Sequence, residues 1–268
     1  MPKNNLDESL FRSNGSEIDR IMRSATAVRI GEVWDAAGVE RPPALDFGTV
    51  HLWKRQLEAP TANVNACYEL LSKEEQERAL RFRIERPRRD FVVTRGTLRL
   101  LLAGYLGIAP RELRFGYEAK GKPLLNGQSG LCFNVSHANG LALMVFVQRR
   151  NIGVDVENLG RETEAERLAE RFFSNREREA LGRLRGDELQ SAFFRCWTRK
   201  EAYIKAKGDG LSLPLHQFDV SIAPNDQDAL QATRPDPAEA GRWRISDVSV
   251  GPGYAAAVAV ETEESSFE

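Results

Sequence analysis

A long helix is predicted over residues 187–207, and two glycines follow it within three residues. Glycine directly after a periodic segment is typical of a helix C-terminus. Trp197, Glu201 and Lys205 recur every four residues, so they lie along one face of this helix. An exposed acid–base pair at this spacing stabilises a helix only weakly, so the pattern becomes informative only together with a second segment.

That second segment, residues 152–157, alternates with the period of two that indicates a strand. Its aliphatic residues point to one side, and Asp155 and Glu157 stand together with Gly153 on the other. Neighbouring carboxylates repel each other unless a counter-charge is present. Mg²⁺ prefers a few carboxylates together with water and substrate phosphates. The pair therefore indicates a magnesium and phosphate site, although two exposed acids at a strand end would give the same pattern.

Composition excludes several functions. The chain has 268 residues and a formal net charge of -1, so bulk attraction to nucleic acid or to a membrane surface is not expected. Its three cysteines share no metal-site spacing, which favours a reduced intracellular protein. There is neither an apolar run of the ~20 residues that span a bilayer nor a signal-peptide core. We expect a cytoplasmic monomer that binds neither nucleic acid nor membrane.

The order of predicted elements repeats along the chain. The first half contains a capping box at Ser72 and Glu75, a helix from about 89 to 106, a turn at 120–124, and strands at 131–137 and 141–147. The second half contains helices at 162–173 and 175–207, a turn at 210–214, and strands at 218–222, 242–250 and 254–260. This order predicts an α+β fold of two similar α/β subdomains related by approximate two-fold symmetry.

This order of elements divides the chain into four predicted segments. We expect an N-terminal extension over residues 1–45, helical around 16–27 and without a readable role, an N-terminal subdomain over 46–151, a C-terminal subdomain over 152–260 and an acidic tail over 261–268. The N-terminal subdomain should begin with a strand near Thr49, and residues 223–241 should form a long loop or loose hairpin.

Eight arginines fall between residues 78 and 99, opposed only by Glu85 and Asp90. They could be solvated helix faces, a nucleic-acid patch or a phosphate site for a small molecule. No base-stacking or groove-reading motif accompanies them, which disfavours nucleic acid. Arginine grips phosphate through paired donors, so the small-molecule phosphate site is favoured.

The pair Ser136-His137 could suggest a serine hydrolase. Adjacent residues of a strand point to opposite faces, however, and no nucleophile-elbow motif surrounds the serine. A polar pair that contacts a ligand phosphate is favoured, and a histidine with a purely structural role remains the alternative.

Five short motifs occur in the order and spacing of one family. They are Gly121-Lys122-Pro123, Phe133-Asn134-Val135-Ser136-His137, the strand Ile152–Glu157, Arg171-Phe172-Phe173-Ser174 with Glu177, and Trp197–Ala206 with Gly208 and Gly210-Leu211. Through these motifs the chain resembles the Gsp/Sfp-type 4'-phosphopantetheinyl transferases over roughly residues 49–260. Residues 1–45 have no counterpart in the resemblance.

The resemblance implies a magnesium-dependent transfer of 4'-phosphopantetheine from coenzyme A to a serine of an apo acyl or peptidyl carrier protein, with release of adenosine 3',5'-bisphosphate. It implies that Mg²⁺ is held by Asp155, Glu157 and Glu201. Positions that match coenzyme contacts are Arg78, Arg95, Lys122, Pro123, Ser136, His137, Lys200 and Lys205. Which arginines of 78–99 reach the coenzyme, and which carrier is used, are left open.

The catalytic roles implied for helix 187–207 fit the chemistry of such a transfer. Glu201 can take the proton of the attacking serine, directly or through a metal-bound water, and Lys205 can neutralise the departing phosphate, with Lys200 on the same helix. Two other functions use the same acids. One is a different magnesium-dependent phosphoryl transferase or nuclease, which no Walker or kinase motif supports, and the other is a coenzyme-binding or carrier-binding module without catalysis, which needs no base.

Overall fold

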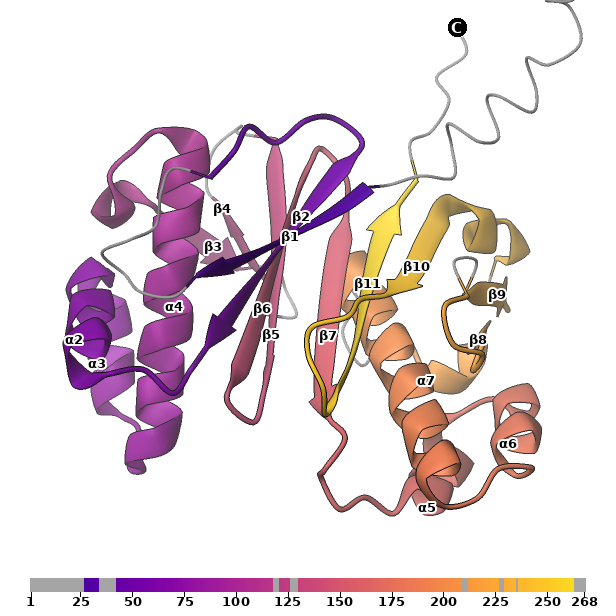
Figure 1. The fold of residues 1–268 in the computed structure, drawn as a ribbon. Coiled ribbons are helices and arrows are strands. Elements are labelled where there is room, and N and C mark those ends of the chain that lie inside the picture. The colour runs from indigo at the N-terminus through magenta and orange to yellow at the C-terminus, as the bar shows by residue number, and fades with distance from the viewer. Residues whose placement is uncertain are drawn as a thin grey trace, which may run out of the picture.

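The computed structural model describes residues 27–33, 42–117, 121–125, 130–208, 212–226, 229–234 and 236–262. Two sheets face each other at the centre, and a long helix covers the outer side of each (Figure 1). Aliphatic side chains of both sheets, such as Leu52, Val145 and Val258, form the core between them. Within this part of the chain, no helix has the length and apolarity that a membrane span requires.

The elements of the first half are β1 (Ala27–Val33), β2 (Thr49–Gln56), α2 (Thr61–Leu70), α3 (Lys73–Leu80), α4 (Glu85–Leu106), the 3-10 turn η2 (Pro110–Glu112), β3 (Phe115–Tyr117), β4 (Pro123–Leu125), β5 (Leu131–Ala138) and β6 (Leu141–Gln148). The first sheet has the strand order β1-β2-β6-β5, with β1 parallel to β2 and the other pairs antiparallel. Strand β6 lies between core layers on both faces, which is why residues 141–147 are all buried.

The elements of the second half are β7 (Ile152–Asn158), α5 (Ala165–Phe172), α6 (Asn175–Leu181), α7 (Gly186–Lys207), η4 (Leu215–Gln217), β8 (Phe218–Val220), β9 (Leu230–Thr233), η5 (Pro237–Arg242), β10 (Trp243–Asp247) and β11 (Tyr254–Glu261). The second sheet is antiparallel with the order β10-β11-β7. The apolar side chains of α7 pack on the outer face of this sheet.

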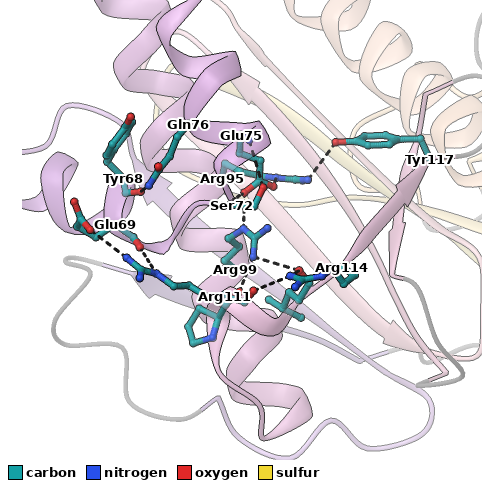
Figure 2. Close-up of polar contacts among 12 residues, drawn as sticks. Tyr68, Glu69, Ser72, Glu75, Gln76, Arg95, Arg99, Arg111, Arg114 and Tyr117 are labelled. Carbon is teal, nitrogen blue, oxygen red and sulfur yellow. Dashed lines mark hydrogen bonds and ion pairs between the residues drawn. The ribbon is translucent and has the colours of Figure 1, made fainter.

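Each half contains a buried ion pair at an equivalent position. Ser72 and Glu75 form the predicted capping box at the start of α3, and Ser174 and Glu177 form the same box at the start of α6. Glu75 Oε2 lies 2.6 Å from Arg99 Nε, and Glu177 Oε1 lies 2.8 Å from Lys200 Nζ. Figure 2 shows the copy in the first half.

The cations of both pairs hold the following turn in the same way. Arg99 Nη1 donates to Pro110 O at 2.6 Å, and Lys200 Nζ donates to Leu215 O at 2.8 Å. Their helices, α4 and α7, both have 22 residues and end at a glycine in the left-handed conformation. The approximate two-fold symmetry predicted from the order of elements therefore extends to individual side chains, and the predicted α+β fold is confirmed.

Several boundaries differ from the sequence prediction. Residues 27–33 were expected in the extension but form β1. Among the described strands, β1 pairs only with β2, and Glu32 of β1 forms an ion pair with Lys54. The helix expected over 175–207 is broken at 182–185, and α4 begins at Glu85. The expected loop 223–241 contains β9, which pairs with β8 as a loose hairpin. The helix expected around 16–27 and most of the acidic tail lie outside the described residues.

Strand β7 and helix α7 approach each other closely at Gly153. A Cβ atom on this residue would lie 2.1 Å from Ala202 O and 2.5 Å from Ala206 N of α7. Both are backbone atoms of a packed helix, so they cannot yield as a flexible side chain would. The glycine therefore sets the distance between β7 and α7.

We predict that Gly153→Ala lowers the free energy of unfolding by about 2 kcal/mol or more, because overpacking against backbone forces the helix away from the sheet. Urea denaturation measures the change. Gly241→Ala is the control, since a Cβ there meets no atom within 4 Å. A Gly153→Ala variant as stable as the control would contradict this account of the packing.

Candidate active site

Three side chains from three elements meet beside this close approach. Lys205 Nζ of α7 lies 2.6 Å from Asp155 Oδ1 of β7 and 3.1 Å from Ser136 Oγ of β5. Ser136 Oγ in turn donates to Asp155 Oδ1 at 2.9 Å. Asp155 and Ser136 are buried, and Lys205 is partly exposed. The site therefore lies where the two halves of the chain touch.

The helix positions its polar residues as the four-residue spacing predicts. Trp197, Glu201 and Lys205 are partly exposed, whereas residues 198–200, 202–204 and 206 are all buried. One face of α7 thus opens from the core toward solvent, next to the acidic side of β7. The predicted common face is confirmed.

Burial and neighbouring charge make Glu201 unusual. Its burial is the main cause, and the Asp155 charge adds to it, so that the pKa of the Glu201 carboxyl rises to about 7 although Lys205 opposes the shift. Burial and Asp155 also raise the pKa of Glu157, against the opposing charge of Arg161, which lies 3.3 Å away. The three carboxyl groups therefore repel one another in the ligand-free protein.

This acidic group suits a cation. Asp155 Oδ2 is buried and accepts no hydrogen bond from any residue that the structure describes. A buried carboxylate oxygen without a partner is costly, and a hard cation is the partner that oxygen ligands favour. Among the described residues, no group of three or more acidic, histidine or cysteine side chains is already placed to hold a metal ion. The arrangement fits an open Mg²⁺ site that is completed by water or phosphate oxygens.

Comparison with known proteins identifies the family. The sequence model of the 4'-phosphopantetheinyl transferase superfamily matches residues 151–259, and that of the 4'-phosphopantetheinyl transferase N-terminal region matches residues 56–148. The 4'-phosphopantetheinyl transferase HetI of Nostoc sp. (strain PCC 7120) is 40% identical over 225 residues, covering 82% of this chain and 92% of HetI.

This chain belongs to the 4'-phosphopantetheinyl transferase superfamily. More distant relatives include the 4'-phosphopantetheinyl transferase Sfp of Bacillus subtilis (strain 168), 28% identical over 70% of this chain and 81% of Sfp. The human L-aminoadipate-semialdehyde dehydrogenase-phosphopantetheinyl transferase is 27% identical over 72% of this chain and 68% of its own length. Enzymes of the superfamily transfer phosphopantetheine from coenzyme A to a serine of a carrier protein, so the predicted family and reaction are confirmed.

Lys200 lies outside the site of this transferase. Its side chain is 0% exposed and donates to Leu215 O and Phe218 O in addition to its pairing with Glu177. It is one residue from Glu201 but points into the core on another face of α7. The catalytic and coenzyme-binding roles expected for Lys200 are therefore replaced by a structural one.

Arg95 is engaged in the same kind of network. Its Nε lies 2.5 Å from Glu75 Oε1, and its Nη2 donates to the Tyr117 hydroxyl at 3.3 Å (Figure 2). Its guanidinium lies 3.7 Å from the centre of the Phe115 ring. Burial would raise the pKa of Glu75, but the hydrogen bond from Arg99 and the charge of Arg95 outweigh it and hold that pKa below its ordinary value. The coenzyme contact expected for Arg95 is thus not favoured by its surroundings.

The other residues predicted to contact the coenzyme lie on several elements. Lys122 Nζ donates to Ala206 O at 3.1 Å, at the end of α7 next to Lys205, and Pro123 begins β4 directly after it. His137 is exposed, on the opposite face of β5 from Ser136, as the strand periodicity predicts. Arg78 is exposed on α3, with its guanidinium 5.1 Å from the centre of the Phe91 ring.

Sequence reasoning missed the role of Asn134. Its Oδ1 accepts a hydrogen bond from Val154 N at 3.1 Å, although β5 and β7 belong to different sheets. The amide thus joins the strand that carries Ser136 to the strand that carries Asp155. The available signal was its spacing: Asn134 and Ser136 are two residues apart, so they share one face of a strand.

We predict that Glu201→Gln stabilises the metal-free protein at pH 8. The folded-state pKa of about 7 lies above the ordinary value of 4.5, so wild-type stability falls as pH rises from 4.5 through 7. A neutral side chain avoids this loss, and the gain is about 1–2 kcal/mol after a discount for solvent screening. Urea denaturation with a chelator should show the gain at pH 8 and little of it at pH 5. Glu162→Gln, at an exposed position, is the control, and equal gains at both pH values would contradict the repulsion.

We also predict that Lys200 of α7 is needed for stability and that Lys205 of the same helix is needed for activity. Lys200→Met leaves the Glu177 carboxylate buried without its counter-charge, which should cost about 3–5 kcal/mol of unfolding free energy. Lys205→Met should cost less stability and remove most of the transfer activity. Denaturation and transfer assays on the folded proteins measure both. A stable but inactive Lys200→Met variant would restore the catalytic role of Lys200.

Proposed function

We propose that this transferase is magnesium-dependent and that Asp155, Glu157 and Glu201 hold the metal while an apo acyl or peptidyl carrier protein receives the phosphopantetheine. The observation that supports the metal site is the buried, unpartnered Oδ2 of Asp155 beside two carboxyl groups with raised pKa values. We further propose that the enzyme acts as a monomer in the reducing cytoplasm, which agrees with its three free cysteines.

The reaction joins the serine oxygen of the carrier to the phosphorus that bears pantetheine, and the bond from that phosphorus to adenosine 3',5'-bisphosphate breaks. When bound, Mg²⁺ supplies charge neutralisation on the pyrophosphate. Glu201 takes the proton of the serine hydroxyl, and its pKa of about 7 suits a general base near neutral pH. The choice of Glu201 rests on its position on the open face of α7, next to Asp155.

Lys205 serves the departing phosphate. Its ammonium group binds Asp155 Oδ1 and Ser136 Oγ, and its charge acts on Glu157 and Glu201, so it belongs to the acidic site. An ammonium at this place can donate a hydrogen bond or a proton to the leaving group. Ser136 orients both charged groups through its hydroxyl, which agrees with a polar contact and not with a hydrolase nucleophile.

The coenzyme is proposed to lie across the junction between the halves. Lys122 and Pro123 border it at the end of α7, and the exposed His137 borders it at the end of β5. Arg78, the exposed arginine of the two predicted, is the candidate for the 3'-phosphate, because a guanidinium offers paired donors to phosphate oxygens.

Transfer to a panel of apo-carriers tests the proposal. The enzyme is incubated with coenzyme A and apo-carriers of the fatty-acid, polyketide and nonribosomal-peptide classes, and mass spectrometry measures the gain of the phosphopantetheine mass. We expect the gain to require Mg²⁺ and to disappear with a chelator. Equal transfer in the presence of the chelator would exclude the metal site.

Glu201→Gln separates catalysis from coenzyme binding. Glutamine retains an oxygen ligand but cannot act as a base, and the loss of a positioned base costs roughly 10²–10⁴ in rate. We therefore predict a large fall in single-turnover transfer with only a modest change in coenzyme affinity by calorimetry. A variant that transfers at nearly the wild-type rate would remove the catalytic role from Glu201.

A further inference from the structure

Two large aliphatic side chains are exposed at the junction of α3 and α4. Leu80, the last residue of α3, is 63% exposed, and Ile84, the residue before α4, is 66% exposed. The loop between them contains Arg81 and Arg83, which are also exposed. Single exposed aliphatic residues are ordinary, but two within five residues and with arginines between them form a distinct surface, here called the α3–α4 surface.

The stability of α4 does not explain why residue 84 is an isoleucine. It occupies the N-cap position of α4 in an extended conformation, with φ -113° and ψ 131°, and its side chain makes no capping hydrogen bond. Serine, threonine, aspartate or asparagine is strongly preferred at this position, and isoleucine is among the least favourable residues. A departure from a local rule without a structural compensation points to a functional reason.

The loop between α3 and α4 is packed against α4. The Phe82 ring packs on the Phe91 ring of α4, with the ring centres 5.5 Å apart. The Arg78 guanidinium lies over the same Phe91 ring. Phe82 therefore anchors the loop inward, while Leu80 and Ile84 on either side of it stay exposed.

The α3–α4 surface lies at the same end of the molecule as the acidic group. Arg86 Nη2 donates to Asn139 Oδ1 in the β5–β6 turn at 3.1 Å, and the Tyr254 hydroxyl donates to Asn139 O at 3.0 Å. Tyr254 stands opposite Asn158, the residue after Glu157. In Figure 1 the β5–β6 turn, the end of β7 and the start of β11 lie at this same edge.

The chemistry of the surface indicates its partner. The Arg81 and Arg83 side chains make no hydrogen bond or ion pair with the residues that the structure describes, so their charge is available to an acidic partner. A coenzyme phosphate could use the arginines, but it offers nothing to Leu80 and Ile84. An acidic protein helix with apolar residues among its acids satisfies both kinds of side chain.

We propose that the α3–α4 surface is the docking site of the carrier protein, which presents an acidic, partly apolar helix next to its acceptor serine. This inference rests on the proposed function, and it names the surface by which that function recognises its protein substrate. Leu80 and Ile84 supply the apolar anchor, and Arg81 and Arg83 supply the charge.

The test measures docking separately from catalysis. The acceptor serine of each carrier in the panel is replaced by alanine, the carrier is labelled with a fluorophore, and its dissociation constant is measured by anisotropy. We expect the Leu80→Ser/Ile84→Ser double variant to bind about tenfold or more weakly, because buried anchors dominate such interfaces. Its coenzyme affinity should be unchanged, and its melting temperature should be unchanged or higher, since serine is a better N-cap.

Ile108→Ser is the matched control. Ile108 is also aliphatic and exposed, at 40%, but it follows the opposite end of α4. Equal carrier binding by the double variant and the control would overturn the proposal, and so would weaker coenzyme binding with unchanged carrier binding. Failure of the wild-type enzyme to modify any carrier that it binds would instead count against the proposed function alone.

Discussion

The contact between β7 and α7 is the constraint on which the rest of the site depends. Gly153 lets the helix backbone approach the strand, and that approach brings Lys205 Nζ within 2.6 Å of Asp155 Oδ1. The same strand is joined to the first half through Asn134. Ser136 and Lys205 contact Asp155 from different halves of the chain, so neither half contains the site alone.

The buried ion pairs make the two halves structurally similar, although the acidic site has no counterpart among them. Glu75 with Arg99 and Glu177 with Lys200 lock a short capped helix to a long helix in each half. Both pairs lie away from the acidic group around Asp155. The repeated part of the fold is thus its framework, while the functional residues stand on the strand and helix face that differ between the halves.

Helical periodicity predicted the site residues better than the family resemblance did. Helical periodicity predicted that Glu201 and Lys205 share one face, as the structure shows, and it was not applied to Lys200, which lies on another face. The resemblance alone grouped Lys200 with them, because a sequence motif records adjacency along the chain and not direction in space. Arg95 was grouped with coenzyme contacts for the same reason, although Glu75 pairs with it across 20 residues of sequence. The pairing of the edge strand β1 with β2 joins segments separated by residues 34–48, so local patterning did not predict it.

In the proposed mechanism, the same physical terms oppose folding and favour catalysis. Burial and the Asp155 charge raise the pKa of Glu201 to about 7, which destabilises the charged form in the folded protein and matches the pKa that suits a general base near neutral pH. A cation that relieved this repulsion would link ligand binding to stability, because anything that binds only the folded state stabilises it. A fold in which framework pairs such as Glu177 and Lys200 lie outside the site can tolerate this cost, since the residues that destabilise it are not the residues that hold its helices together.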